Sequence, residues 1–250
     1  MPESPDTTVI NDDTAKRRPV VLAIGGHDPG GGAGIQADIE TLSSLGVHPL
    51  TLITALTVQD TLDVALVEPV PVGLFSRVLD ALDADIAIDA IKIGLVGDAA
   101  IAGAIAGFID RHPDMPVVLD PVLAAGGGTE MSSEAIRAAM LEKLLPRVTL
   151  VTPNLPEAQR LSGESDAAAC AARLLENGAG NVLITGGHES GETVINRWFH
   201  AGGVERFAWE RLDGEFHGSG CTLASAIAVF LARGMPIKLA LRLAQAFTHD

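Results

Sequence analysis

The sequence has 250 residues, of which 47% are hydrophobic, and it carries 17 Lys and Arg against 32 Asp and Glu, a formal net charge of −15. This acidic balance argues against nucleic acid or an anionic membrane as a partner, because both bind basic surfaces. It does not exclude an anionic small molecule, since backbone N–H groups bind phosphate without net positive charge. No apolar run reaches the roughly 20 residues of a membrane span. With two cysteines and no signal-peptide pattern, we expect a cytoplasmic protein.

Residues 1–18 are polar, and we expect a disordered leader followed by a single domain over 19–250. In that domain, short aliphatic segments alternate with amphipathic segments. The pattern predicts, in chain order, a strand at 19–26, a helix at 34–46, a strand at 50–56, a helix near 73–84, a strand at 89–94, a helix at about 98–111, a strand at 115–122, a helix at about 132–144, a strand at 148–153, helices around 154–162 and 166–177, a strand at 181–187, a hairpin at 193–211 turning at 201–203, and helices at about 219–233 and 236–248.

Near-continuous aliphatic strands that alternate with helices are typical of a parallel sheet buried on both faces. We therefore expect an α/β fold, with a doubly wound, mostly parallel sheet, helices on both faces and an antiparallel hairpin at one edge. Ligands in such folds bind at the carboxyl ends of the strands, and each motif below follows a predicted strand.

The first motif is a glycine-rich turn, "GGHDPGGGAGIQAD" (25–38). It formally satisfies the dinucleotide pattern G-x-G-x-x-G/A, but the acidic residue that should follow about 20 positions later is absent, since the nearest is Asp60. The turn is either structural or contacts a ligand through its backbone, with Gln36 and Asp38 at the helix start. The sequence has no Gly-Lys pair, so any ATP is bound without a P-loop.

Carboxylates follow two further strands. Asp120 ends the buried segment "VVLDPV" (117–122), where an acid must be paired or hydrogen-bonded. In "LVTPNLPEAQRL" (150–161), Asn154 and Glu157 are three residues apart at a helix start. Two interpretations stay open there: a capping box, or a hard-cation site, because Mg²⁺ prefers oxygen ligands beside nucleotide phosphates.

A cysteine lies in the last motif, "FHGSGCTLASA" (216–226). Its glycines let backbone N–H groups converge at the positive end of a helix, which predicts an anion hole and a lowered pKa for the Cys221 thiol. The alternatives are a small packed residue or a Cys–His hydrolase that uses His27, His188 or His217. The other cysteine, Cys170, is predicted to be a buried residue of an alanine-rich helix.

Taken together, these motifs with "IKIGLVGD" (91–98) and "GGH" (186–188) resemble the ribokinase-like superfamily, and within it the hydroxymethylpyrimidine/phosphomethylpyrimidine kinases of thiamine biosynthesis. The resemblance runs from about residue 19 to the end. It implies ATP- and Mg²⁺-dependent phosphorylation of 4-amino-5-hydroxymethyl-2-methylpyrimidine and then of its monophosphate, by a homodimer.

The resemblance also implies roles for individual residues. The pyrimidine would be bound by Gln59, Asp38, Ala33, Val122 and Leu95. The catalytic group would comprise Cys221 as base with Gly218 and Gly220. ATP would face Asn154, Thr185 and Ser219, and Mg²⁺ would be held by Glu157 and Asp120. Thr185 stands where the family usually has a lysine, and "LAAGGGTE" (123–130) lacks a second one. Pyridoxal kinase of the same superfamily and a non-catalytic pyrimidine-binding regulator are the alternatives.

Overall fold

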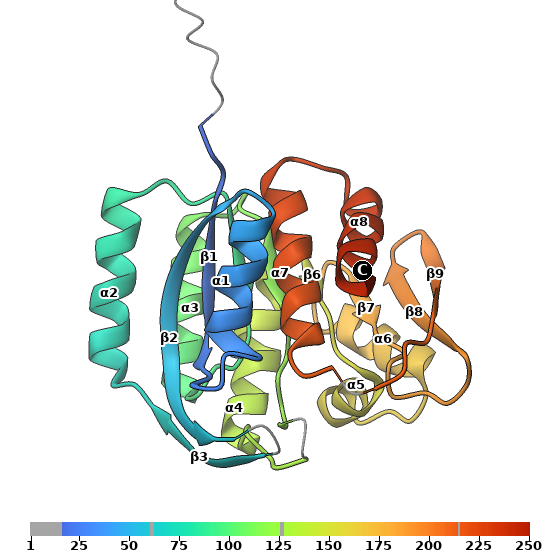
Figure 1. Cartoon of the computed structure of the whole chain (residues 1–250). Helices are drawn as coiled ribbons and strands as arrows, with labels where there is room; N and C mark the ends of the chain where they lie inside the picture. Colours follow the sequence, from blue (N-terminus) through green and yellow to red (C-terminus); the bar gives the residue numbers. More distant parts are fainter. Residues whose placement is uncertain (1–16, 61–62, 126–127, 215) are drawn as a thin grey trace, which may run out of the picture.

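In the described residues of this computed structural model (17–60, 63–125, 128–214 and 216–250), nine strands form one sheet (Figure 1). Its order is β3-β2-β1-β4-β5-β6-β7-β8-β9. The strands are β1 (Val20–His27), β2 (His48–Gln59), β3 (Val64–Pro69), β4 (Ala90–Ile93), β5 (Val117–Leu119), β6 (Leu150–Val151), β7 (Val182–Ile184), β8 (Thr193–His200) and β9 (Gly203–Glu210). The strands from β2 through β7 pair in parallel, whereas β3, β8 and β9 pair antiparallel with their neighbours. The predicted mostly parallel sheet with an edge hairpin is confirmed.

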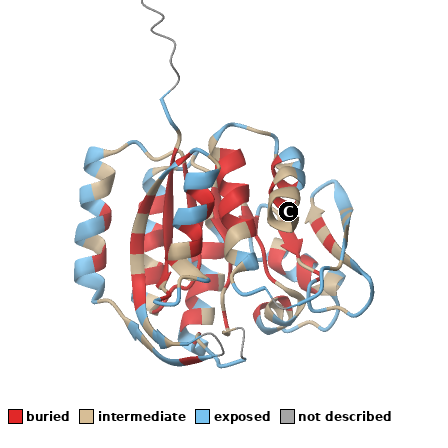
Figure 2. Ribbon diagram, viewed as in Figure 1, coloured by how far each residue is buried: buried red, intermediate tan, exposed pale blue. Residues whose placement is uncertain are grey.

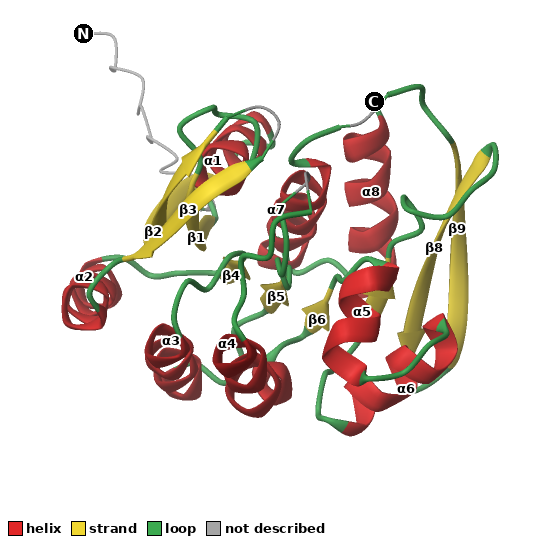
Figure 3. Ribbon diagram, turned by 90° about the horizontal axis from the view of Figure 1, so that it is seen from below, coloured by secondary structure: helices red, strands yellow, loops and turns green. Residues whose placement is uncertain are grey.

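Helices cover both faces of the sheet (Figure 3). One face carries α1 (Gly34–Ser44), α7 (Ser219–Ala232) and α8 (Ile237–His249), and the other carries α2 (Val72–Asp85), α3 (Ala99–Arg111), α4 (Glu134–Ala139), α5 (Leu155–Ser162) and α6 (Ala167–Glu176). Successive strand residues point to opposite faces: Ile91 and Ile93 of β4 pack in the α2–α6 core, and Ala90 packs in the α1–α7–α8 core. The central strands are therefore buried on both sides (Figure 2).

Two segments differ from the sequence-based prediction. The strand β3 was not predicted, because most of Val64–Pro69 is not buried and the segment is held as a strand by antiparallel pairing with β2, as in Val58↔Leu66. The single helix predicted at 132–144 is α4 followed by a π-helical turn (Met140–Leu144) and a 3₁₀ turn (Leu145–Arg147).

The predicted leader lies mostly outside the described residues, which begin at Arg17. Its last two residues contact the domain: Arg17 pairs with Asp89 at 2.7 Å, and Arg18 donates hydrogen bonds to the carbonyls of Gly46 and Val47. Across the described part of the chain, no helix has both the length and the apolar character needed to span a membrane.

Candidate active site

The glycine-rich turn after β1 is organised by Asp28. This carboxylate is buried and accepts hydrogen bonds from the backbone N–H groups of Gly30 and Ala33, both at 2.8 Å. Gln36, from the first turn of α1, accepts a hydrogen bond from the Asp28 N–H at 3.0 Å. Ala33 is the N-cap of α1. The turn is thus held in one conformation by its own aspartate.

A second turn, before α7, packs directly against the first. Gly218 is the N-cap of α7 with φ 78°, and a Cβ atom there would lie 2.0 Å from the Gly32 carbonyl oxygen. Only glycine fits, because the conformation is left-handed and the other backbone is too close. Across the same contact, Nε2 of His217 lies 3.7 Å from Oδ2 of Asp28. The Gly34 N–H lies close enough to the Cys221 sulfur to lower the pKa of this thiol. The two glycine motifs therefore meet at the cysteine.

The start of α7 presents its first backbone N–H groups beside this sulfur. The Ser219 N–H bonds weakly to the Phe216 carbonyl at 3.5 Å, and the Thr222 N–H bonds to the Gly218 carbonyl at 2.9 Å. The N–H groups of Gly220 and Cys221, between them, have no carbonyl within the helix to bond. Ser219 and Gly220 are exposed. With the partial positive charge of the helix N-terminus, this geometry suits an anion such as phosphate.

Two acidic side chains, those of Asp120 and Asp38, also act on Cys221. Asp120, directly after β5, is 6% exposed, and burial raises its pKa. The Cys221 thiol lies close enough to this carboxylate to counteract part of the rise in its pKa. Burial, together with the negative charges of Asp120 and Asp38, raises the pKa of Cys221 to about 12 despite the nearby Lys92. The expectation of a lowered thiol pKa is wrong here, because burial and two carboxylates outweigh the helix terminus. Within the described residues, no histidine is hydrogen-bonded to Cys221, and the Cys–His hydrolase loses its support.

Glu157 and Asn154 form a capping box at the start of α5. The Glu157 N–H donates to Asn154 Oδ1 at 2.8 Å, and the Asn154 N–H donates to Glu157 Oε2 at 3.0 Å. Burial and the neighbouring Asp120 raise the pKa of Glu157 to about 8. The capping interpretation is confirmed. The Glu157 carboxylate also lies close enough to Asp120 for the negative charge of Asp120 to raise its pKa.

The other predicted residues lie along the same edge of the sheet. Thr185, after β7, forms a parallel bridge with Asn154 through its N–H to the Pro153 carbonyl. Leu95 is buried after β4, and Val122 is partly buried after Asp120. Gln59 ends β2 and is partly buried, but in the described residues no hydrogen bond joins it to the cluster around Cys221.

Sequence reasoning missed two polar residues beneath the site, Lys92 and Ser225. Lys92 Nζ lies 2.7 Å from Asp38 Oδ1, and both side chains are almost completely buried. Ser225 Oγ donates to the same oxygen at 2.7 Å. Asp38 is thus 0% exposed and bound within the protein rather than open to a ligand. The available signal was a lysine between four apolar or glycine neighbours in "AIKIG".

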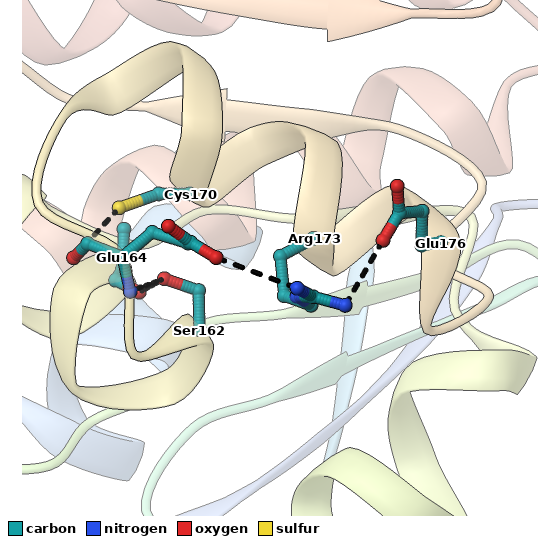
Figure 4. Close-up of polar contacts among 6 residues, drawn as sticks. Ser162, Glu164, Cys170, Arg173 and Glu176 are labelled. Carbon is teal, nitrogen blue, oxygen red and sulfur yellow. Dashed lines mark hydrogen bonds and ion pairs between the residues drawn. The ribbon is translucent and has the colours of Figure 1, made fainter.

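The second cysteine, Cys170, is a buried residue of a helix, as predicted. Cys170 of α6 is 0% exposed, and its sulfur lies 3.6 Å from the Glu164 carbonyl oxygen (Figure 4). In the same picture, Arg173 pairs with Glu164 and Glu176 at the α5–α6 junction. This thiol lies in the packing of α6 and is not part of the candidate site.

Comparison with known proteins shows the family to which the chain belongs. A sequence model of the family described as phosphomethylpyrimidine kinase matches residues 28–250. The chain is 39% identical over 237 residues to the hydroxymethylpyrimidine/phosphomethylpyrimidine kinase of Rhizobium meliloti, covering 92% of this chain and 89% of that protein. It is 40% identical over 233 residues to the thiamine biosynthesis bifunctional protein ThiED of Geobacter sulfurreducens, covering 91% of this chain but only 48% of that protein. The chain therefore spans about half the length of the latter.

Solved structures show the same fold. The pyridoxal kinase from Staphylococcus aureus in complex with pyridoxal superposes with a TM-score of 0.84 at 30% identity, covering 92% of this chain and 86% of that one; it has also been solved with ADP and with AMP-PCP. The phosphomethylpyrimidine kinase from Clostridium difficile 630 superposes with a TM-score of 0.80 at 30% identity, covering 92% and 98%. The chain belongs to the phosphomethylpyrimidine kinase family, with a ribokinase-like fold.

Proposed function

We propose that this protein transfers the γ-phosphoryl group of ATP to 4-amino-5-hydroxymethyl-2-methylpyrimidine, and then to the monophosphate so formed. The family supports the reaction class, and one structural observation supports its location. At the start of α7, where the N–H groups of Gly220 and Cys221 have no backbone partner among the described residues, the Cys221 thiol lies close enough to the Gly34 N–H and to the Asp120 carboxylate for both to act on its pKa. This site offers charge stabilisation for a phosphoryl group beside a group that can contact the acceptor oxygen.

Each step of the phosphoryl transfer would depend on particular groups of this chain. Backbone N–H groups at 219–221 would stabilise the charge of the transferring phosphoryl group. In the first step, the Cys221 sulfur would take the hydroxymethyl proton as its own proton passes to Asp120. In the second step the acceptor is a phosphate oxyanion that needs no base, and a thiol with a pKa of about 12 approaches it uncharged. The pyrimidine would lie against Ala33, Leu95, Val122 and Gln59, as the family resemblance implies, with Asp38 beneath rather than in contact.

The residues fit a magnesium ion brought in with ATP. Partial burial and then Asp120 raise the pKa of Glu157, and the repulsion between these two carboxylates is relieved by a divalent cation. Each carboxylate has two oxygens, so the capping bond of Glu157 and the nearness of the Cys221 thiol to Asp120 leave acceptor sites open. The bound ion would neutralise charge on the ATP phosphates, which we place against Asn154, Thr185 and Ser219.

One assay tests this assignment against its alternatives. Turnover of ATP should be measured in parallel with hydroxymethylpyrimidine, its monophosphate and pyridoxal. We expect both pyrimidines to be phosphorylated and pyridoxal to be the poorer acceptor. Pyridoxal as the preferred acceptor would favour the activity of the Staphylococcus aureus neighbour, and thermal stabilisation by the pyrimidines without turnover would indicate a binding protein. We further propose a homodimer, which sedimentation velocity would test.

A further inference from the structure

A buried ion pair crosses the layer directly below the candidate site. Lys92 extends from β4, Asp38 from α1 and Ser225 from α7, and all three are 0% exposed. Both the ammonium and the hydroxyl are 2.7 Å from the same oxygen, Asp38 Oδ1. One carboxylate oxygen therefore joins the central strand to the two helices whose starts form the site.

The ion pair lies one helical turn beneath the contact between the two glycine motifs. Asp38 follows Gly34 by four residues on α1, and Ser225 follows Cys221 by four residues on α7. Residues four apart share one face of a helix, one turn from each other. In the upper turn the Gly34 N–H lies near the Cys221 sulfur, and in the lower turn Ser225 and Lys92 contact Asp38.

Lys92 is directed toward this edge of the sheet. Its strand neighbours Ile91 and Ile93 pack into the opposite core, so Lys92 faces α1 and α7. A Cβ atom on Gly94, two residues further along, would lie 2.9 Å from Nζ. The missing side chain at Gly94 thus leaves room for the ammonium near the carboxyl end of β4, where its charge also acts on Asp120 and Cys221.

Stability alone does not account for such a pair. Well-packed apolar residues of similar volume are often as stable as a buried ion pair, because burying two charges offsets their attraction. In addition, Asp38 Oδ2 has no hydrogen-bond partner among the described residues, so the carboxylate is not fully compensated. We infer that Lys92 is a positioning residue: through Asp38 and Ser225 it holds the starts of α1 and α7 at the separation at which Gly34 and Cys221 meet.

The test uses the variant Lys92→Met and the double variant Lys92→Met/Asp38→Asn. The matched control is Leu174→Ala, which opens a cavity at a buried position of α6 away from the site. Amide hydrogen exchange is followed by mass spectrometry in residues 30–38, 218–226 and, for reference, 100–110. Activity is followed as kcat and KM for both pyrimidine acceptors; only this second readout rests on the proposed function.

For Lys92→Met we expect exchange to accelerate in 30–38 and 218–226 but not in 100–110. We also expect kcat to fall by about 100-fold, the loss typical of a small misplacement of catalytic groups, with a much smaller change in KM. The double variant should regain stability, since no unpaired charge is left, yet keep the faster exchange and the low kcat. Leu174→Ala should lose stability without either change.

Exchange at the parent's level in both segments of Lys92→Met, or of the double variant if the single one fails to fold, would overturn the inference. So would equal changes in Leu174→Ala, which would reveal a general loss of stability. If the parent itself phosphorylates no pyrimidine while Lys92→Met still loosens the two segments, the positioning role stands and the proposed function fails.

Discussion

Replacing Glu157 by glutamine removes a partly buried carboxylate while keeping the size of the side chain. Burial first, and then Asp120, raise the pKa of Glu157 from 4.5 to about 8. Between these values the folded chain keeps a proton that the unfolded chain has released, so this group lowers the free energy of unfolding as the pH rises. The slope is about 1.4 kcal/mol per pH unit, summing to roughly 5 kcal/mol above pH 8. The glutamine oxygen can still accept the Asn154 N–H, so the capping box is retained.

We therefore expect the Glu157→Gln variant to gain stability relative to the parent by about 1.4 kcal/mol per pH unit between pH 5 and 7.5. Urea unfolding at several pH values measures this difference, with Glu176→Gln, at an exposed position, as the control. Millimolar Mg²⁺ at pH 8 should stabilise the parent and not the variant, because the cation favours the carboxylate. Parallel stability–pH curves for parent and variant would refute the reasoning, and equal stabilisation of both by Mg²⁺ would remove Glu157 from the metal site.

Three further predictions concern the start of α7 and its N-cap, Gly218. Cys221→Asp should reduce kcat/KM for the anionic monophosphate more than for the hydroxymethyl acceptor, because a fixed negative charge repels the former; equal losses would reject this explanation. In a Cys170→Ser background, alkylation of Cys221 by iodoacetamide should rise about tenfold per pH unit from pH 7 to 10, because its pKa is about 12, and a plateau below pH 8 would contradict that value. Gly218→Ala should lose about 2–4 kcal/mol of stability, because alanine is strained in the left-handed conformation and its Cβ atom would meet the Gly32 carbonyl. The control Gly107→Ala, at a position of α3 with open space around it, should be neutral or stabilising. Calorimetry measures both melting temperatures, and similar values for the two variants would show that the two turns separate easily.

Most of the fold could be predicted because its strands are aliphatic and its helices amphipathic. The parallel strands are buried on both faces, and that produces the uninterrupted aliphatic runs seen around Leu22 and Val118. The strand β3 could not be predicted in the same way. Leu66 remains 51% exposed, and the segment is a strand because it pairs with β2, which is a tertiary cause.

The turns that form the site could be predicted from the sequence, but the interactions between their side chains could not. Glycine and acidic residues after strands pointed to the correct edge, where Cys221, Asp120 and Glu157 are brought together. The charge state of the thiol was not predictable, because it depends on burial and on acids from other strands. Lys92 was missed since a lysine in an aliphatic strand becomes informative only when its partner Asp38 is located.

The most direct measurement is a crystal structure of the protein with hydroxymethylpyrimidine and a non-hydrolysable ATP analogue. The account predicts that the terminal phosphate accepts hydrogen bonds from the backbone N–H groups at 219–221 and that the hydroxymethyl oxygen lies within hydrogen-bonding reach of the Cys221 sulfur. A terminal phosphate bound elsewhere, with the start of α7 unoccupied, would contradict it.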